Sequence, residues 1–89
     1  MFKEIEIQEQ IIEKLGERDL YPFSVVFSFE SPDGGGILSI TFHFEQDLTK
    51  LLDILKYKSQ CDKSGWLIMD KNNTIILTGL ALLNLYTNL

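Results

Sequence analysis

The sequence is poor in the residues that cross-link a chain or anchor it in a membrane. It has a single cysteine, Cys61, so it cannot form the intramolecular disulfides on which short secreted chains usually depend. The longest uncharged run, residues 72–89, holds seven asparagine and threonine residues and is too polar for a membrane span. The first fifteen residues carry four glutamates, which is unlike a secretion signal. These scarcities predict a cytoplasmic protein with no membrane partner.

Basic residues are also scarce, because eight lysines and arginines stand against thirteen aspartates and glutamates, a net charge of −5. Proteins that bind nucleic acid directly usually present a basic patch to the phosphates, so that class is disfavoured. Hydrophobic residues make up 45% of the 89 residues, which argues against disorder. A chain of this length can bury one modest core. We therefore expect residues 1–89 to form a single acidic domain.

The residues that usually carry catalysis or bind metals are few and separated. Cys61 and His43 are the only cysteine and histidine, and a nucleophilic pair would need them within hydrogen-bond reach of each other. Glu30 and Glu45 are expected at opposite ends of a hairpin, too far apart for acid–base catalysis. The glycine run 34–36 lacks the lysine and the following helix of a phosphate-binding loop. The sequence therefore predicts no enzymatic activity, no metal site and no cofactor.

Two segments alternate apolar and polar residues, as strands with one buried face do. They are residues 23–30 and 37–45, and the glycine-rich segment 31–36 between them is typical of a turn. This pattern predicts an antiparallel hairpin with eight apolar side chains on one buried face. The eight residues are Phe23, Val25, Phe27, Phe29, Leu38, Ile40, Phe42 and Phe44.

Two further segments show the apolar spacing of amphipathic helices. Residues 2–18 form the first, and Gly16 lies near its expected end, where a left-handed residue is often needed. The second helix is expected to begin after Asp47, a natural N-cap, and to run to about Gln60. Its leucines at 48, 51, 52 and 55 predict a stripe that packs on the apolar face of the hairpin.

The remaining chain predicts two short strands and a last helix. Residues 66–70 and 74–78 read as strands around a tight turn, where asparagine tolerates a positive φ. Residues 79–89 read as a short helix. The order α-β-β-α-β-β-α predicts an α+β domain with a four-stranded, mostly antiparallel sheet packed by helices.

The last helix is expected to be apolar on nearly all sides, and a helix of that kind is either buried or paired. Two interpretations stay open: it packs inside the domain, or it forms a homodimer interface. The candidate interface residues are Leu80, Leu82, Leu83, Leu85, Tyr86 and Leu89.

Acidic residues are concentrated in the first half of the chain. Four glutamates of the first helix fall within about 80° of one another around its axis. Residues 19–47 add five more acidic residues with no lysine or arginine. These charges either serve only as a solvated surface or bind a basic partner surface, such as one that normally binds nucleic acid. The candidate partner-binding residues are Glu6, Glu9, Glu13, Glu17, Glu30, Asp33, Glu45 and Asp47.

The pattern as a whole favours a non-catalytic acidic module that binds another protein. An inhibitor, an immunity-type protein or a phage accessory protein that blocks a basic surface of a larger protein would fit it. The alternative is a structural or adaptor subunit, or a homodimer, that uses its apolar C-terminal segment. A small enzyme or ligand-binding protein is the least favoured hypothesis.

Overall fold

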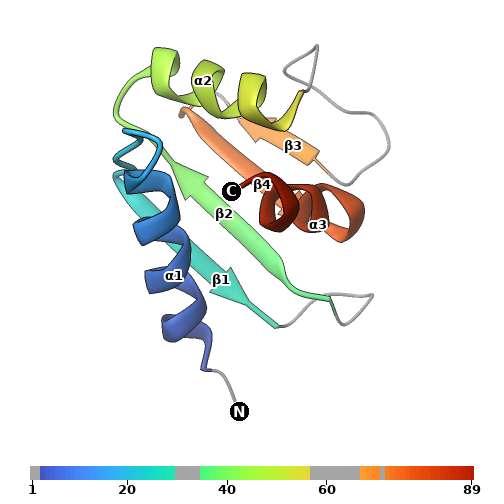
Figure 1. The fold of residues 1–89 in the computed structure, drawn as a ribbon. Helices are drawn as coiled ribbons and strands as arrows, with labels where there is room; N and C mark the ends of the chain where they lie inside the picture. The colour runs from blue at the N-terminus through green and yellow to red at the C-terminus, as the bar shows by residue number, and fades with distance from the viewer. Residues whose placement is uncertain (1–2, 30–34, 57–66, 71) are drawn as a thin grey trace.

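Three helices lie on an antiparallel sheet in the computed structural model, which describes residues 3–29, 35–56, 67–70 (backbone only) and 72–89 (Figure 1). The α+β class predicted from the sequence is confirmed. The elements are α1 (Glu4–Gly16), β1 (Ser24–Ser28), β2 (Ile37–Thr41), α2 (Glu45–Leu55), β3 (Leu67–Asp70), β4 (Thr74–Thr78) and α3 (Gly79–Asn88).

The sheet has β2 between β1 and β4, antiparallel to both. The register places Val26 opposite Ser39 and Ser39 opposite Ile76, so these three residues share one face. β3 continues the backbone pairing along the outer side of β4. The strands whose side chains pack against the helices in the described chain, β1, β2 and β4, form a three-stranded antiparallel sheet, and β3 is described only by its backbone pairing with β4.

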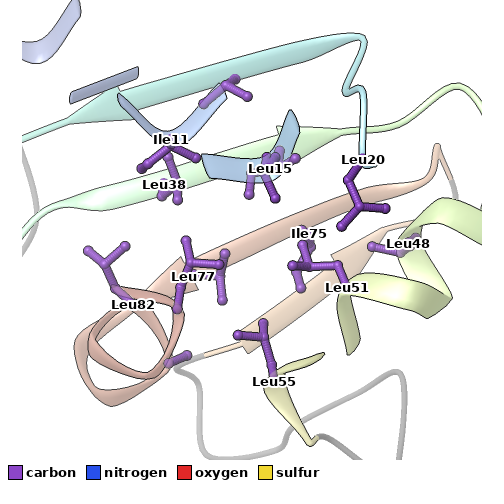
Figure 2. Packing of buried hydrophobic residues seen from close by; sticks show 14 of the residues in the cluster. Ile11, Leu15, Leu20, Leu38, Leu48, Leu51, Leu55, Ile75, Leu77 and Leu82 are labelled. Carbon is purple, nitrogen blue, oxygen red and sulfur yellow. The ribbon is translucent and has the colours of Figure 1, made fainter. Parts of the chain in front are cut away.

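One hydrophobic core lies between the helices and one face of the sheet (Figure 2). The sheet contributes every second residue of β1, β2 and β4, as its two-residue side-chain period requires. The leucine stripe predicted for α2 is confirmed as buried in this core. The helices contribute Ile11 and Leu15 from α1, Leu48, Leu51, Leu52 and Leu55 from α2, and Ala81, Leu82 and Leu85 from α3.

The apolar face of the hairpin is buried only in its middle. Phe23, Phe29 and Phe44 are exposed by 67%, 45% and 62%, so the prediction of eight buried residues is wrong at the strand ends. β1 and β2 are each five residues long, and these three phenylalanines lie beyond their ends. Side-chain alternation continues past the point where a helix covers the sheet, so it overestimates the core. The five buried positions are Val25, Phe27, Leu38, Ile40 and Phe42.

α2 begins earlier than the sequence suggested. Its N-cap is Phe44, and Asp47 lies in the first turn, where its backbone N–H donates to the Phe44 carbonyl at 3.2 Å. The assignment of Asp47 as the N-cap is therefore wrong. Its carboxylate still lies in the first turn, where the helix dipole favours a negative charge.

Three residues other than glycine have positive φ angles in the described chain, each in a turn. Asp19, rather than Gly16, has the left-handed conformation after α1, with φ 59°. Lys56 has φ 62° directly after α2, so the helix ends at Leu55 and the predicted end near Gln60 is wrong. Asn73 has φ 58° in the turn before β4, as its side chain predicted.

Side chains join the C-terminal ends of the three helices. The last carbonyls of a helix have no partner inside it. The Asn84 side chain in α3 donates to the Leu55 carbonyl at the end of α2, at 3.0 Å. The Asn88 side chain donates to Asn84, and the guanidinium of Arg18, just after α1, donates to the Asn88 carbonyl at 2.9 Å. This chain of bonds ties α1, α2 and α3 together at one end.

α1 also contacts the edge of the sheet. β1 pairs with β2 on one side only, so its other side is an edge. The Phe27 backbone N–H points to that edge and donates to the Gln8 side chain of α1 at 2.9 Å. The Gln8 side chain thus accepts a hydrogen bond from a backbone N–H that could otherwise pair with a strand of another chain.

Candidate functional site

The acidic face of α1 is the first candidate surface. Ile11 and Leu15 point into the core, and the four glutamates predicted to share one arc lie on the exposed side of the helix. Their exposure is confirmed, whereas their binding to a partner stays a prediction. The acidic face of α1 consists of Glu6, Glu9 and Glu13 in the helix and Glu17 at its C-cap.

Of the other predicted acidic residues, Glu45 and Asp47 lie in the described part of the chain. Glu30 and Asp33 lie outside the described residues, in the connection between β1 and β2. That connection joins the strand ends farthest from α2, whereas Glu45 and Asp47 lie in the first turn of α2. Glu45 is exposed and Asp47 is half-buried.

A group of exposed aromatic rings lies at the end of the sheet nearest the start of α2. The rings of Phe23 and His43 are edge-to-face, with centroids 5.0 Å apart, and the rings of His43 and Phe44 are 6.2 Å apart. All three side chains are exposed, and we call them the aromatic end. Tyr21, also exposed, precedes them in the loop after α1.

Sequence reasoning missed the aromatic end because alternation placed Phe23 and Phe44 in the core. One signal was available. Glu45 and Asp47 are typical first-turn residues of a helix, because the helix dipole favours negative charge there. A helix that begins at Glu45 ends the strand before Phe44 and leaves that ring outside the sheet.

Two exposed acidic residues lie close to the aromatic end in the sequence. Asp19 lies exposed in the turn before β1, and Glu45 directly follows Phe44. No lysine or arginine occurs between Asp19 and Asp47. Arg18, the nearest basic residue before this segment, directs its guanidinium to the end of α3. The segment of sequence that carries the aromatic end therefore contains acidic residues and no basic one.

α3 has two faces, which resolves part of the ambiguity of the apolar tail. Leu82 and Leu85 belong to the protein's own core, and Leu89 is partly buried against it. Leu82 and Leu85 are therefore not available to a second chain. The Tyr86 side chain is only partly covered, and this partial desolvation raises the pKa of its hydroxyl because it disfavours the phenolate. The exposed stripe of α3 consists of Leu80 (56% exposed), Leu83 (58%) and Tyr86 (44%).

The described residues show no group of side chains typical of metal binding. No three of their His, Cys, Asp and Glu side chains come together as metal ligands. His43 contacts two phenylalanines, and Cys61 lies outside the described part of the chain. Within that same part, no helix has the length and apolar character needed to cross a bilayer. Comparisons with protein-family models, with curated proteins and with solved structures gave no match.

Proposed function

We propose that this protein is a non-catalytic binding module whose acidic surface docks onto a basic surface of a larger protein. The observation that carries the proposal is the acidic face of α1, with four exposed carboxylates opposite the core side of the helix. Like charges four residues apart, as in Glu9–Glu13 and Glu13–Glu17, destabilise a helix by a few tenths of a kcal/mol each (about 0.2–0.5). Lysine and arginine side chains of a partner would relieve that repulsion.

The net charge of −5 supports the same proposal at longer range. At physiological salt the field of a charged face extends about 8 Å into the solvent. Such a field increases the rate of encounter with a basic surface more than it increases final affinity. A partner surface that normally binds nucleic-acid phosphates would suit this module, which would then act as an inhibitor, an immunity-type protein or a phage accessory protein.

A single charge reversal tests this proposal. Glu13→Lys reverses one charge in the acidic face, and Asp53→Lys makes the same change at an exposed position of α2. Each protein would be used to capture partners from the source cells, and the association rate of the captured partner would be measured at several salt concentrations. We expect Glu13→Lys to slow association by roughly two- to fivefold and to weaken its salt dependence. Asp53→Lys should have a smaller effect.

The two variants should keep the melting temperature of the parent within a few degrees, because both sites are exposed. Equal association rates for the two variants would contradict docking through the acidic face of α1. So would an association rate that does not respond to a tenfold rise in salt.

A second candidate function is a homodimeric or adaptor subunit, favoured by the exposed stripe of α3. This helix carries no charged residue in its first or last turn, and the stripe leaves three large side chains in water. An exposed apolar patch of this kind usually marks an interaction site. Sedimentation at micromolar concentration discriminates the two functions: a dimer favours the subunit, and a monomer favours the acidic module.

A further inference from the structure

The edge of the sheet at β1 has no protection within the strand itself. An edge strand presents backbone groups that another strand can pair with, and proteins usually block them with a lysine, a proline or an inward-pointing charge. None of these occurs in β1, whose residues are Ser24, Val25, Val26, Phe27 and Ser28. Its valines and phenylalanine favour strand pairing instead. Protection of this edge therefore has to come from another element.

Gln8 of α1 is the polar residue that reaches this edge. It lies three and seven residues before Ile11 and Leu15, the two buried residues of the helix, so it shares their side. A half-buried glutamine at a position that suits an apolar residue is costly unless its polar atoms are bonded. Here its side-chain oxygen accepts the Phe27 backbone N–H at 2.9 Å. The bond to the strand edge explains the glutamine.

The backbone groups on this edge are complementary to those of a second copy. In an antiparallel ladder, every second residue directs its N–H and C=O groups to the same side. Phe27 faces the edge, because its N–H donates to Gln8, and Val25, two residues earlier, faces it as well. An antiparallel pair of two β1 strands centred on Val26 would set Val25 of each chain opposite Phe27 of the other. These residues would exchange N–H···O=C bonds, but Gln8 holds one of the donors.

We propose that Gln8 closes the edge of β1 against β1 of a second copy of this chain. α1 lies along β1 (Figure 1), and its first two turns act as the cover. Those turns are held loosely, since Ile5 is exposed and Ile7 is only partly buried against the core. Ile11 and Leu15 fix the rest of the helix in the core. Releasing the bond between Gln8 and Phe27 opens the edge, and two chains then join in one continuous sheet.

A second copy fits this edge better than an unrelated strand does. β1 is uncharged, so two copies meet without repulsion within the strand pair. Twofold symmetry sets Val26, which is 53% exposed, against Val26 of the other chain, and branched side chains pack well across strands. Every copy also presents the same strand already in the extended conformation, so no segment has to become ordered before it pairs.

The test compares two substitutions of Gln8 by sedimentation over a range of concentrations. Gln8→Leu removes the acceptor and keeps a side chain of similar size, whereas Gln8→Glu keeps an oxygen that accepts the Phe27 N–H. We expect Gln8→Leu to tighten self-association by roughly 9- to 25-fold, that is about three- to fivefold for each of the two bonds that pairing breaks. Gln8→Glu should associate no more tightly than the parent.

Two further variants locate the contact and control for added apolar surface. Gln10→Leu makes the same change at an exposed position of α1 and should behave as the parent does. Adding Val26→Lys to Gln8→Leu sets two lysines opposite each other across the twofold axis and should reverse the association. Far-ultraviolet circular dichroism should be the same for all these variants, because none of the three positions is fully buried.

Three results would overturn the proposal. In the first, Gln8→Leu folds but associates no more tightly than Gln8→Glu. In the second, association of Gln8→Leu survives Val26→Lys, which would place the contact elsewhere, such as on the exposed stripe of α3. The third applies if Gln8→Leu does not fold, when hydrogen exchange of the parent decides. Slow exchange of the Phe27 amide would support closure of the edge by Gln8, and exchange as rapid as in an unfolded chain would contradict it.

Discussion

At the scale of single residues, Gly36 occupies a position that requires glycine, for two reasons. Its φ is +100°, a conformation that side chains rarely adopt. A Cβ atom at this position would also lie 2.5 Å from Cζ of Phe27. Gly36 therefore lets the Phe27 ring lie against the backbone where β2 begins. The sequence identifies a turn at 34–36, but the contact with Phe27 becomes visible only in the folded chain.

We expect Gly36→Ala to lower the free energy of unfolding by about 1–3 kcal/mol, because the new methyl group forces Phe27 to move and strains the backbone. Gly16→Ala is the matched control. Gly16 ends α1, and the nearest atom to its added Cβ would be Cε1 of Tyr21 at 3.9 Å. That variant should gain about 0.5–1 kcal/mol, as alanine does over glycine in a helix. Urea unfolding measures both, and an equal loss in the two variants would contradict this role of Gly36.

At the scale of elements, α3 is an apolar helix with one side buried in the core and the other side exposed. Its composition is too uniform for the sequence to reveal a buried face, because leucines occur on all sides. The packing assigns Leu82 to the core and Leu83 to the solvent, although they are adjacent in the chain. The distinction arises because the helix docks on β4 and α2 with one side only (Figure 1).

This assignment predicts opposite outcomes for two neighbouring substitutions. Leu82→Glu places a carboxylate in the core and should destabilise the protein by several kcal/mol, about 3–5, enough to unfold much of it. Leu83→Glu should leave the melting temperature nearly unchanged and yield a monomer if the exposed stripe of α3 joins two chains. Thermal melts and analytical ultracentrifugation measure both effects. A dimer that survives Leu83→Glu would exclude this stripe as its interface.

At the scale of the whole molecule, one core cluster includes residues from all three helices and from β1, β2 and β4. A domain with a single core of this kind is expected to unfold in one cooperative transition. Its stability should be only about 5–15 kcal/mol, so one large core side chain represents a considerable share.

Substitutions of Phe27 and Phe23 test whether the core extends as described. Both residues belong to the same alternating segment, but only Phe27 is buried. Phe27 is 3% exposed, and Phe27→Ala should cost about 3–5 kcal/mol in a single transition. Phe23→Ala changes a side chain that is largely in water and should cost about 0.5 kcal/mol or less. Circular dichroism and tryptophan fluorescence should give the same midpoint for each variant. If the free energy of unfolding falls by a similar amount in both variants, the buried face of the hairpin extends to Phe23.

The sequence by itself determined the features that depend on a few neighbouring residues. Periodicity of two and of 3.6 located the strands and helices, the leucine stripe of α2 and the outward direction of the acidic face of α1. Local turn chemistry likewise predicted the positive φ of Asn73. These patterns are local because backbone geometry fixes where each side chain points relative to its neighbours in the chain.

Only the tertiary structure decided which apolar residues are covered. Whether Phe23 or Leu83 is buried depends on what packs above it, and the covering residues come from distant parts of the chain. The same holds for hydrogen bonds that join elements, such as Gln8 with Phe27 and Arg18 with Asn88, which span 19 and 70 residues. The aromatic end is a surface of this kind, since two loops meet there only after β1 and β2 have paired. Which apolar side chains are buried, and which distant residues form hydrogen bonds, depends on how the whole core assembles. The sequence of a few neighbouring residues does not determine either.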